Sequence, residues 1–243
     1  MPSARRTNTI IACITLACAW TPCPVQAAAM GSPASVLKKG RWAFGLSSSV
    51  TPTRDLSDNS TAMMYQIGHV RGYGVTDWLS LYGTIGGASL TVDDPSIKKA
   101  NDPSTSNSFG ANVLVALQAK GKLFENKAKT WEWDGGLQYV DIRARHKNKN
   151  EARWSEWQLA TSVAKSFGCF KPYLGVSYDL LAVKFRVREN GALLKQSRYE
   201  NNTPVGAFLG TDVYLGSSED VVLNVESIYL NGAEISVALS YNF

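Results

Sequence analysis

Apolar and polar residues alternate along most of this chain, and this alternation constrains the fold more than any other feature of the sequence. In the last eleven residues the apolar positions are Ala233, Ile235, Val237, Leu239, Tyr241 and Phe243. The positions between them carry mostly polar side chains, including Glu234 and Asn242. Successive side chains of a β-strand point to opposite faces, so a period of two predicts a strand with one apolar and one polar surface.

The same pattern recurs upstream and predicts ten strands. Their expected ranges are 41–51, 62–73, 77–90, 107–119, 129–143, 153–166, 171–185, 203–216, 220–230 and 233–243. Most are longer than the roughly 9 to 11 residues that a tilted membrane-spanning strand needs. Tight turns alternate with long polar loops, as in outer-membrane barrels. The expected long loops are residues 52–61, 91–106, 144–152 and 186–202.

These features predict an all-β fold, a closed antiparallel transmembrane β-barrel of about ten strands; eight or twelve strands also fit the pattern. Lipid offers no hydrogen-bond partners, so a sheet that crosses it must close on itself. We expect apolar side chains to face lipid rather than form a core, and both termini to be periplasmic. A secreted barrel with its apolar face inward is the competing fold, but Asp212 and Glu226 on the polar face suit a narrow lumen better.

Residues 1–29 are organised differently from the rest of the chain. Arg5 and Arg6 precede an apolar stretch at 10–19 and small residues at 27–29. This order predicts a cleaved secretory signal peptide, with an uncleaved anchor or a lipid at Cys18 as weaker alternatives. We expect a short periplasmic segment at 30–40 and the barrel at 41–243. Cleavage would leave Cys169 as the single cysteine, which excludes an intrachain disulfide.

The signal peptide, the alternating strands and the terminal strand resemble bacterial outer-membrane β-barrel proteins of the small, porin-like class, without indicating a closer family. The resemblance covers nearly all of the mature chain. It implies a location in the bacterial outer membrane, contact with outer-membrane lipid, and recognition by the barrel assembly machinery. In that class the assembly signal is a terminal Phe with apolar residues at alternate positions before it. The matching residues here are Val237, Leu239, Tyr241 and Phe243.

A ten-stranded barrel should have a narrow and largely filled lumen. The expected lumen-lining acids are Asp134, Glu156, Asp179, Asp212, Glu226 and Glu234. They could select cations in a narrow channel, or they could form a hydrogen-bonded plug in which Lys184, Arg186 or Lys165 pair with them. The leading functional prediction is therefore a structural or narrow-channel, porin-like protein.

The loop around residues 144–152 is unusually basic, and this feature supports a second function. Its cations are Arg143, Arg145, Lys147, Lys149 and Arg153, and they surround a single acid, Glu151. Lipopolysaccharide phosphates are the nearest dense negative charge at an outer face, and Arg and Lys bind phosphate well. The runner-up is a surface module that binds lipopolysaccharide or an extracellular partner; an ordinary solvated loop is the plain alternative. Nucleic acid is not an expected partner of an exported protein, and the oligomeric state is left open.

Six tryptophans fall near predicted strand ends, where a membrane-interface girdle would lie. They are Trp42, Trp78, Trp131, Trp133, Trp154 and Trp157. In the strand at 171–185, the apolar residues change parity after Leu180 and Leu181. Such a change predicts either a β-bulge or emergence of the strand above the membrane.

No catalytic motif is matched, so we expect no enzymatic activity. Omptin proteases use Asp-His and paired-Asp patterns, and lipid A deacylases use a His with a Ser two residues later. Neither pattern is present at His69 or His146. A proteolytic or lipid-modifying enzyme therefore stands third, on fold analogy alone. No metal site or cofactor is expected.

Overall fold

The computed structural model describes residues 36–94, 106–145, 151–189, 192–216, 220–229 and 232–243. The predicted signal peptide lies outside this part of the chain. The described strands are β1 (Trp42–Asp55), β2 (Thr61–Thr76), β3 (Leu79–Asp93), β4 (Ser106–Glu125), β5 (Trp131–Arg145), β6 (Glu151–Lys165), β7 (Phe170–Glu189), β8 (Ala192–Glu200), β9 (Val205–Leu215), β10 (Val221–Tyr229) and β11 (Ala233–Asn242), with one 3-10 turn, η1 (Ser57–Asn59). No helix among the described residues is long and apolar enough to span a bilayer.

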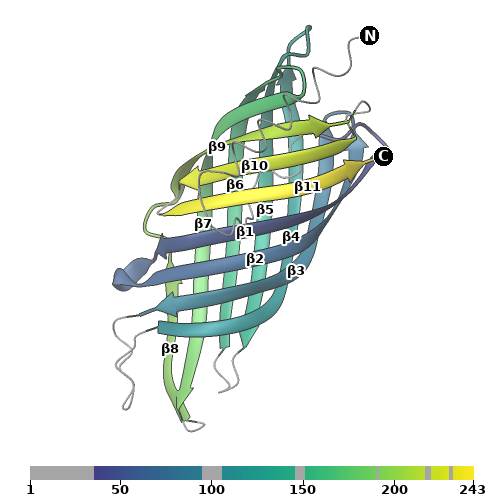
Figure 1. Ribbon diagram of the computed structural model, residues 1–243. Helices are drawn as coiled ribbons and strands as arrows, with labels where there is room; N and C mark the ends of the chain where they lie inside the picture. The colour runs from purple at the N-terminus through teal and green to yellow at the C-terminus, as the bar shows by residue number, and fades with distance from the viewer. Residues whose placement is uncertain (1–35, 95–105, 146–150, 190–191, 217–219, 230–231) are drawn as a thin grey trace, which may run out of the picture.

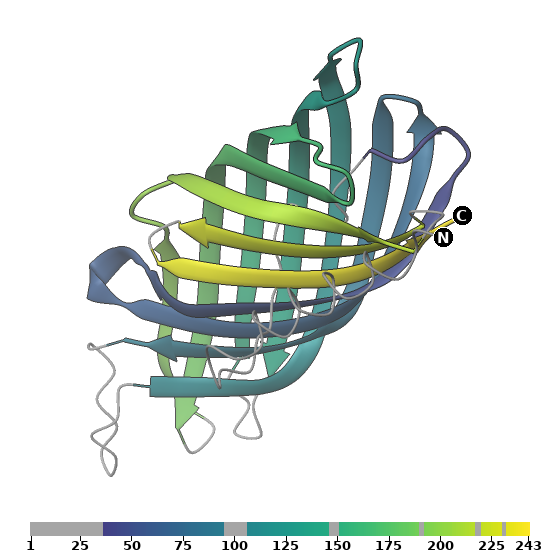
Figure 2. The same ribbon diagram turned by 45° about the horizontal axis from the view of Figure 1, so that its top comes forward.

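Ten of these strands form a closed antiparallel barrel, which confirms the predicted fold class. Each of the ten expected strands is present, and β1 pairs with β11 while β6 pairs with β7 to complete the ring (Figures 1 and 2). Both described ends of the chain lie at one end of the barrel. We call the opposite end, where the β7–β8 hairpin projects, the outer end.

The outward positions of the barrel strands carry apolar side chains over a broad belt, as expected. Leu46, Ile67, Ile85, Leu174 and Leu209 are each more than 60% exposed, while the residues between outward positions are mostly buried. A wide apolar surface of this kind is stable against lipid and not against water.

Five of the six predicted girdle tryptophans lie on the outward surface. They are Trp42, Trp78, Trp131, Trp133 and Trp157. The prediction for Trp154 is wrong, because its side chain points into the barrel and has no exposed surface. The indole Nε1–H of Trp154 donates a hydrogen bond to Glu156 at 2.9 Å, so its polar edge is satisfied in the interior.

The outer half of the interior is an apolar core, and this corrects the expectation that apolar residues face only lipid. Its largest fully buried side chains are Trp154, Tyr199, Phe109, Phe185, Leu56, Met64, Leu90 and Ile142. On β5, β6 and β7 the outward residues at this level are charged, so that part of the outward surface is wet and the inward surface supplies the hydrophobic burial. On these strands the outer half is therefore built like a soluble barrel above a membrane barrel.

The apparent change of parity in β7 has the same cause. Its odd positions point inward throughout, from Tyr173 to Phe185, and its ladder with β6 is continuous from Ala164–Tyr173 to Glu151–Arg186. The bulge alternative is therefore wrong over this ladder, and emergence above the membrane is supported. Where β7 leaves the apolar belt, its outward residues change from apolar to polar and its inward residues change from polar to apolar.

Strand β8 corrects the prediction of a long loop at 186–202. It pairs with the outer part of β7, from Ala182–Glu200 to Glu189–Ala192, and extends that hairpin beyond the barrel wall (Figure 1). Its residues lack a clear apolar face, which is why the alternation did not reveal it. The Asn190-Gly191 dipeptide, a common hairpin turn, was the available signal.

The connection between β1 and β2 crosses the outer ends of the short strands β9, β10 and β11 and reaches the end of β8. Leu56 is fully buried, forms a β-bridge with Asn201, and its carbonyl oxygen accepts a hydrogen bond from Asn202 Nδ2 at 2.9 Å. At the other end, Leu37 is buried and its backbone N–H donates to Ser80 Oγ at 2.7 Å. Packed segments therefore occupy both ends of the lumen.

We predict that Trp154→Ala lowers the free energy of unfolding by about 3–5 kcal/mol, because it leaves a cavity in the outer core. Trp157, three residues further along β6, lies on the outward face. Trp157→Ala is therefore the matched control and should lower the free energy of unfolding much less. Urea titration in detergent micelles, followed by the folded and unfolded bands on unheated SDS gels, measures both. Equal losses for the two variants would contradict the placement of Trp154 in a packed core.

Candidate functional site

The structure brings the predicted lumen acids together inside the barrel. Asp134, Glu156, Asp179, Asp212 and Glu226 are buried, and Glu234 is half-buried on the inward face of β11. Their expected partners, Lys184, Arg186 and Lys165, lie elsewhere. Lys184 and Arg186 project outward at the outer end, and Lys165 packs over the outward ring of Trp131 at 4.8 Å. The predicted pairing is therefore wrong, although the acids are correctly placed.

The cations that face these acids are Arg54, Lys120 and Lys171, which are all buried. Arg54 Nη1 forms an ion pair with Glu156 Oε1 at 2.8 Å, and its guanidinium lies 5.6 Å from the centre of the Trp154 ring. Arg54 stands at the outer end of β1, in the segment assigned to a loop by sequence. No local pattern distinguishes it from an exposed loop arginine, so sequence reasoning missed it.

A second network fills the half of the lumen nearer the termini. Tyr173 Oη donates to Glu226 at 2.6 Å, and Asn224 Nδ2 donates to Tyr173 Oη at 2.9 Å and to Asp212 at 2.7 Å. Lys171 forms an ion pair with Glu132. Buried charge is stable only when it is paired and hydrogen-bonded, and these contacts provide most of that pairing.

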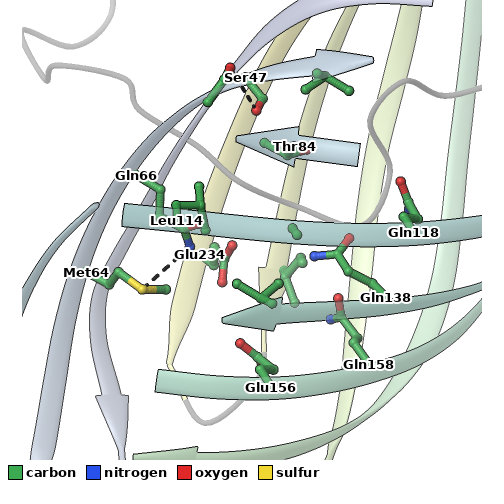
Figure 3. A pocket seen from close by; sticks show the side chains of 15 residues that line it. Ser47, Met64, Gln66, Thr84, Leu114, Gln118, Gln138, Glu156, Gln158 and Glu234 are labelled. Carbon is green, nitrogen blue, oxygen red and sulfur yellow. Dashed lines mark hydrogen bonds between the residues drawn. The ribbon is translucent and has the colours of Figure 1, made fainter. Parts of the chain in front are cut away.

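A small polar chamber lies between the two regions (Figure 3). It holds about 50 Å³ and is lined by Gln66, Gln118, Gln138, Gln158, Glu156 and Glu234, among others. A neighbouring space beside Lys120 and Asp134 holds about 20 Å³. These volumes suit a few water molecules and are far below the open lumen of a porin.

The outward surface changes abruptly at one level on three neighbouring strands. On β5 the outward residues pass from Tyr139 to Asp141, and on β6 from Trp157 to Ser155. On β7 they pass from Leu180 through Ala182 to Lys184. Tyr139 and Trp157 lie side by side with ring centres 4.6 Å apart, as aromatic residues do at a membrane interface. The charged surface therefore begins at the level of lipid headgroups.

A pocket of about 780 Å³ opens in this charged surface, and we call it the rim pocket. Its cations are Arg143, Arg145, Arg153, Lys184, Arg186 and Arg198. Arg143, Arg145 and Arg153 are sequence-predicted candidates, whereas Lys147 and Lys149 lie outside the described residues. Lys184, Arg186 and Arg198 were missed as surface cations because β7 and β8 join the pocket only through pairing with β6 and β7.

The carboxylates of Asp141 and Glu151 hold the rim cations of β5, β6 and β7 at different distances. Asp141 accepts hydrogen bonds from Arg153 Nε at 2.6 Å and from Arg143 Nε at 3.0 Å. Glu151 lies farther from its neighbours, at 3.9 Å from Arg145 Nε and 3.8 Å from Arg186 Nη1. Partial burial acts to raise the pKa of Asp141, but the hydrogen bonds from Arg153 and Arg143 outweigh it and hold the pKa below its ordinary value.

The remaining candidates are placed as follows. His69 points outward near the termini end, where Arg71 Nε donates to its Nε2 at 3.4 Å, and it does not meet the lumen acids. His146 lies outside the described residues. Among the described residues, no group of His, Cys, Asp and Glu is arranged to hold a metal ion.

The predicted assembly residues lie on the outward face of β11. They are Val237, Leu239, Tyr241 and Phe243. The ring of Phe243 stacks on Phe44 of β1 with the ring centres 5.4 Å apart. Their role in assembly stays a prediction.

No protein-family model matches this chain, and no curated protein matches it in sequence. Among solved structures it is similar to the outer membrane protease OmpT from Escherichia coli, with 10% identity, 87% of this chain and 99% of that chain covered, and a TM-score of 0.45. It is also similar to the outer membrane protein OprG from Pseudomonas aeruginosa, with 11% identity, 85% and 97% covered, and a TM-score of 0.44. These likenesses concern the barrel shape, and no residue role is transferred from them.

We predict that Asp141→Asn destabilises the protein at neutral pH and that this deficit fades in acid. A carboxylate with a lowered pKa stabilises the fold above its unfolded-state pKa, and that contribution is lost as the pH falls through the folded-state value. The difference from wild type should be constant above about pH 5 and shrink below about pH 4. Urea titrations across this range measure it, and a deficit that does not change with pH would contradict the Asp141 pairing.

Proposed function

We propose that this protein is a closed, non-conducting barrel of the bacterial outer membrane that binds the phosphorylated glycolipid lipopolysaccharide at its rim pocket. The observation that carries the proposal is the position of the pocket. Six cations line it, and it lies directly above an aromatic pair that marks the membrane interface. In the outer leaflet, this is the level at which lipopolysaccharide phosphates lie.

The chemistry of the rim pocket suits a phosphorylated ligand. Guanidinium groups bind phosphate oxygens through paired N–H donors, and a lysine adds a compact charge. Within the described part of the pocket, Glu151 is the single acidic lining residue. Lys184 has no ion-pair partner among the described residues, so its charge is available to a ligand.

The leading prediction was a structural or narrow-channel protein, and the lumen favours the structural role over the channel. Buried aromatic and aliphatic side chains fill its outer half, and the polar chamber below them holds only about 50 Å³. An ion would have to pass between the packed apolar side chains of the outer core, and such a constriction is closed to ions.

We predict that the purified wild-type protein gives no single-channel steps in planar lipid bilayers, because packed side chains fill the outer lumen. Reproducible steps would contradict the closed barrel. Asp212→Asn and Glu226→Gln variants would then show whether the path follows the lumen acids. A porin reconstituted under the same conditions provides the positive control.

We predict that Lys184→Gln combined with Arg186→Gln weakens binding of bisphosphorylated lipid A by about a hundredfold. Each charge-assisted hydrogen bond contributes about 1.5–3 kcal/mol, and about 1.4 kcal/mol is a tenfold change. Binding to lipid A in detergent micelles can be measured by isothermal titration calorimetry. Lys127→Gln combined with Lys129→Gln removes two exposed cations at the opposite end and is the matched control.

Lipid A from which the phosphates have been removed separates phosphate recognition from acyl-chain contact. The wild-type protein should lose most of its affinity for this form. Equal affinity of the rim variant and the control variant, or equal affinity for the two forms of lipid A, would overturn the proposed function.

A further inference from the structure

Glu151 occupies the centre of the rim pocket's cation pattern. It is the direct cross-strand neighbour of Arg145 on β5 and of Arg186 on β7. Its two carboxylate oxygens face the two arginines separately, Oε1 toward Arg145 at 3.9 Å and Oε2 toward Arg186 at 3.8 Å. A single anion therefore already stands between two guanidinium groups on adjacent strands.

These two ion pairs are loose. Both distances exceed the usual length of a hydrogen bond. The side chains are also accessible, with 85% of Arg145, 52% of Arg186 and 48% of Glu151 exposed. Exposed pairs of this kind are weak, so Glu151 leaves guanidinium donors of both arginines available to another anion. Arg186 Nε is engaged separately, donating to Gln196 Oε1 at 3.1 Å.

The other rim pairs are short, which makes the Glu151 arrangement distinctive. Asp141 holds Arg153 at 2.6 Å and Arg143 at 3.0 Å, and Glu200 holds Arg198 at 3.0 Å. Asp141 therefore fixes the positions of Arg143 and Arg153, and it already neutralises part of their charge. The net positive charge that a ligand meets comes mainly from Arg145, Arg186 and Lys184.

We propose that a phosphate group of the ligand displaces the Glu151 carboxylate from between Arg145 and Arg186, and that Glu151 acts as a built-in competitor that lowers the affinity of the empty site for anionic ligands. This inference rests on the proposed function and assigns the residues that hold one phosphate. The carboxylate now marks the position that one phosphate takes in the complex. Lys184, two residues before Arg186 and on the same outward face, lies beside that position.

The charges of the two groups explain why a phosphate can displace the carboxylate. A carboxylate carries one negative charge, whereas a phosphate monoester carries between about 1.5 and 2 at neutral pH and offers three acceptor oxygens. A phosphate can therefore satisfy both guanidinium groups and Lys184 at once. A carboxylate ligand gains no advantage over Glu151 itself, which is tethered at the site.

The test is Glu151→Gln, which keeps the shape of the side chain and removes its charge. Bisphosphorylated lipid A should bind this variant about twofold to tenfold more tightly than wild type, the range expected from loss of two exposed ion pairs. Dodecanoate, a carboxylate amphiphile that must displace the same group, should gain by a similar factor. The gain therefore measures the free energy of displacing Glu151.

Asp58→Asn is the matched control, because it removes one exposed carboxylate in η1 at the same end of the barrel. It should leave both affinities close to wild type. Unchanged or weaker lipid A binding by Glu151→Gln would overturn the displacement inference, as would an equal gain in Asp58→Asn, which would indicate a general charge effect.

The two proposals fail in different ways. If the wild-type protein does not bind phosphorylated lipid A, the proposed function fails and the displacement inference fails with it. If the wild type binds and Lys184→Gln with Arg186→Gln weakens binding, while Glu151→Gln leaves both affinities unchanged, then only the competitor role of Glu151 is wrong.

Discussion

The structure depends on the requirement that every backbone N–H and C=O group inside a bilayer be bonded within the protein. An open sheet would leave two unpaired edges in lipid, and closure removes both. In this chain the ring is completed by the first and last strands, where Ala43 to Val50 of β1 pair with Asn242 to Ile235 of β11. The backbone groups of Trp42 and Phe243 also bond reciprocally at 2.9 Å. The position of every inward and outward side chain follows from this register.

The two halves of the closed barrel have opposite patterns of apolar and polar side chains on their inward and outward faces. Within the apolar belt the outward face meets lipid, and the small interior is filled by ion pairs such as Lys171 with Glu132 and by hydrogen bonds such as Tyr173 with Glu226. Beyond the belt the outward face meets water, and the interior becomes an apolar core around Trp154 and Phe185. The level of this exchange marks the membrane boundary on β5, β6 and β7.

The rigid outer core gives the rim pocket its geometry. Arg145, Glu151 and Arg186 are spaced by the hydrogen-bond ladder between three adjacent strands, and the residues that alternate with them, such as Ala144, Ala152 and Phe185, are buried in the core beneath. Cations on strands are more precisely placed than cations on loops. A closed interior and a basic outer rim therefore belong to one design, in which the barrel fixes the spacing of the cations on its rim.

The sequence by itself determined the ten barrel strands and their lipid-facing side, because a period of two is a local property that each of these segments shows on its own. It also placed all six lumen acids on the inward face. The tertiary structure alone decided which cations meet those acids, that Trp154 is buried, that β8 extends β7, and that Lys184 and Arg186 join Arg145 at the rim. Each of these depends on the register between strands far apart in sequence, and on the height at which each strand leaves the membrane, neither of which a local pattern contains.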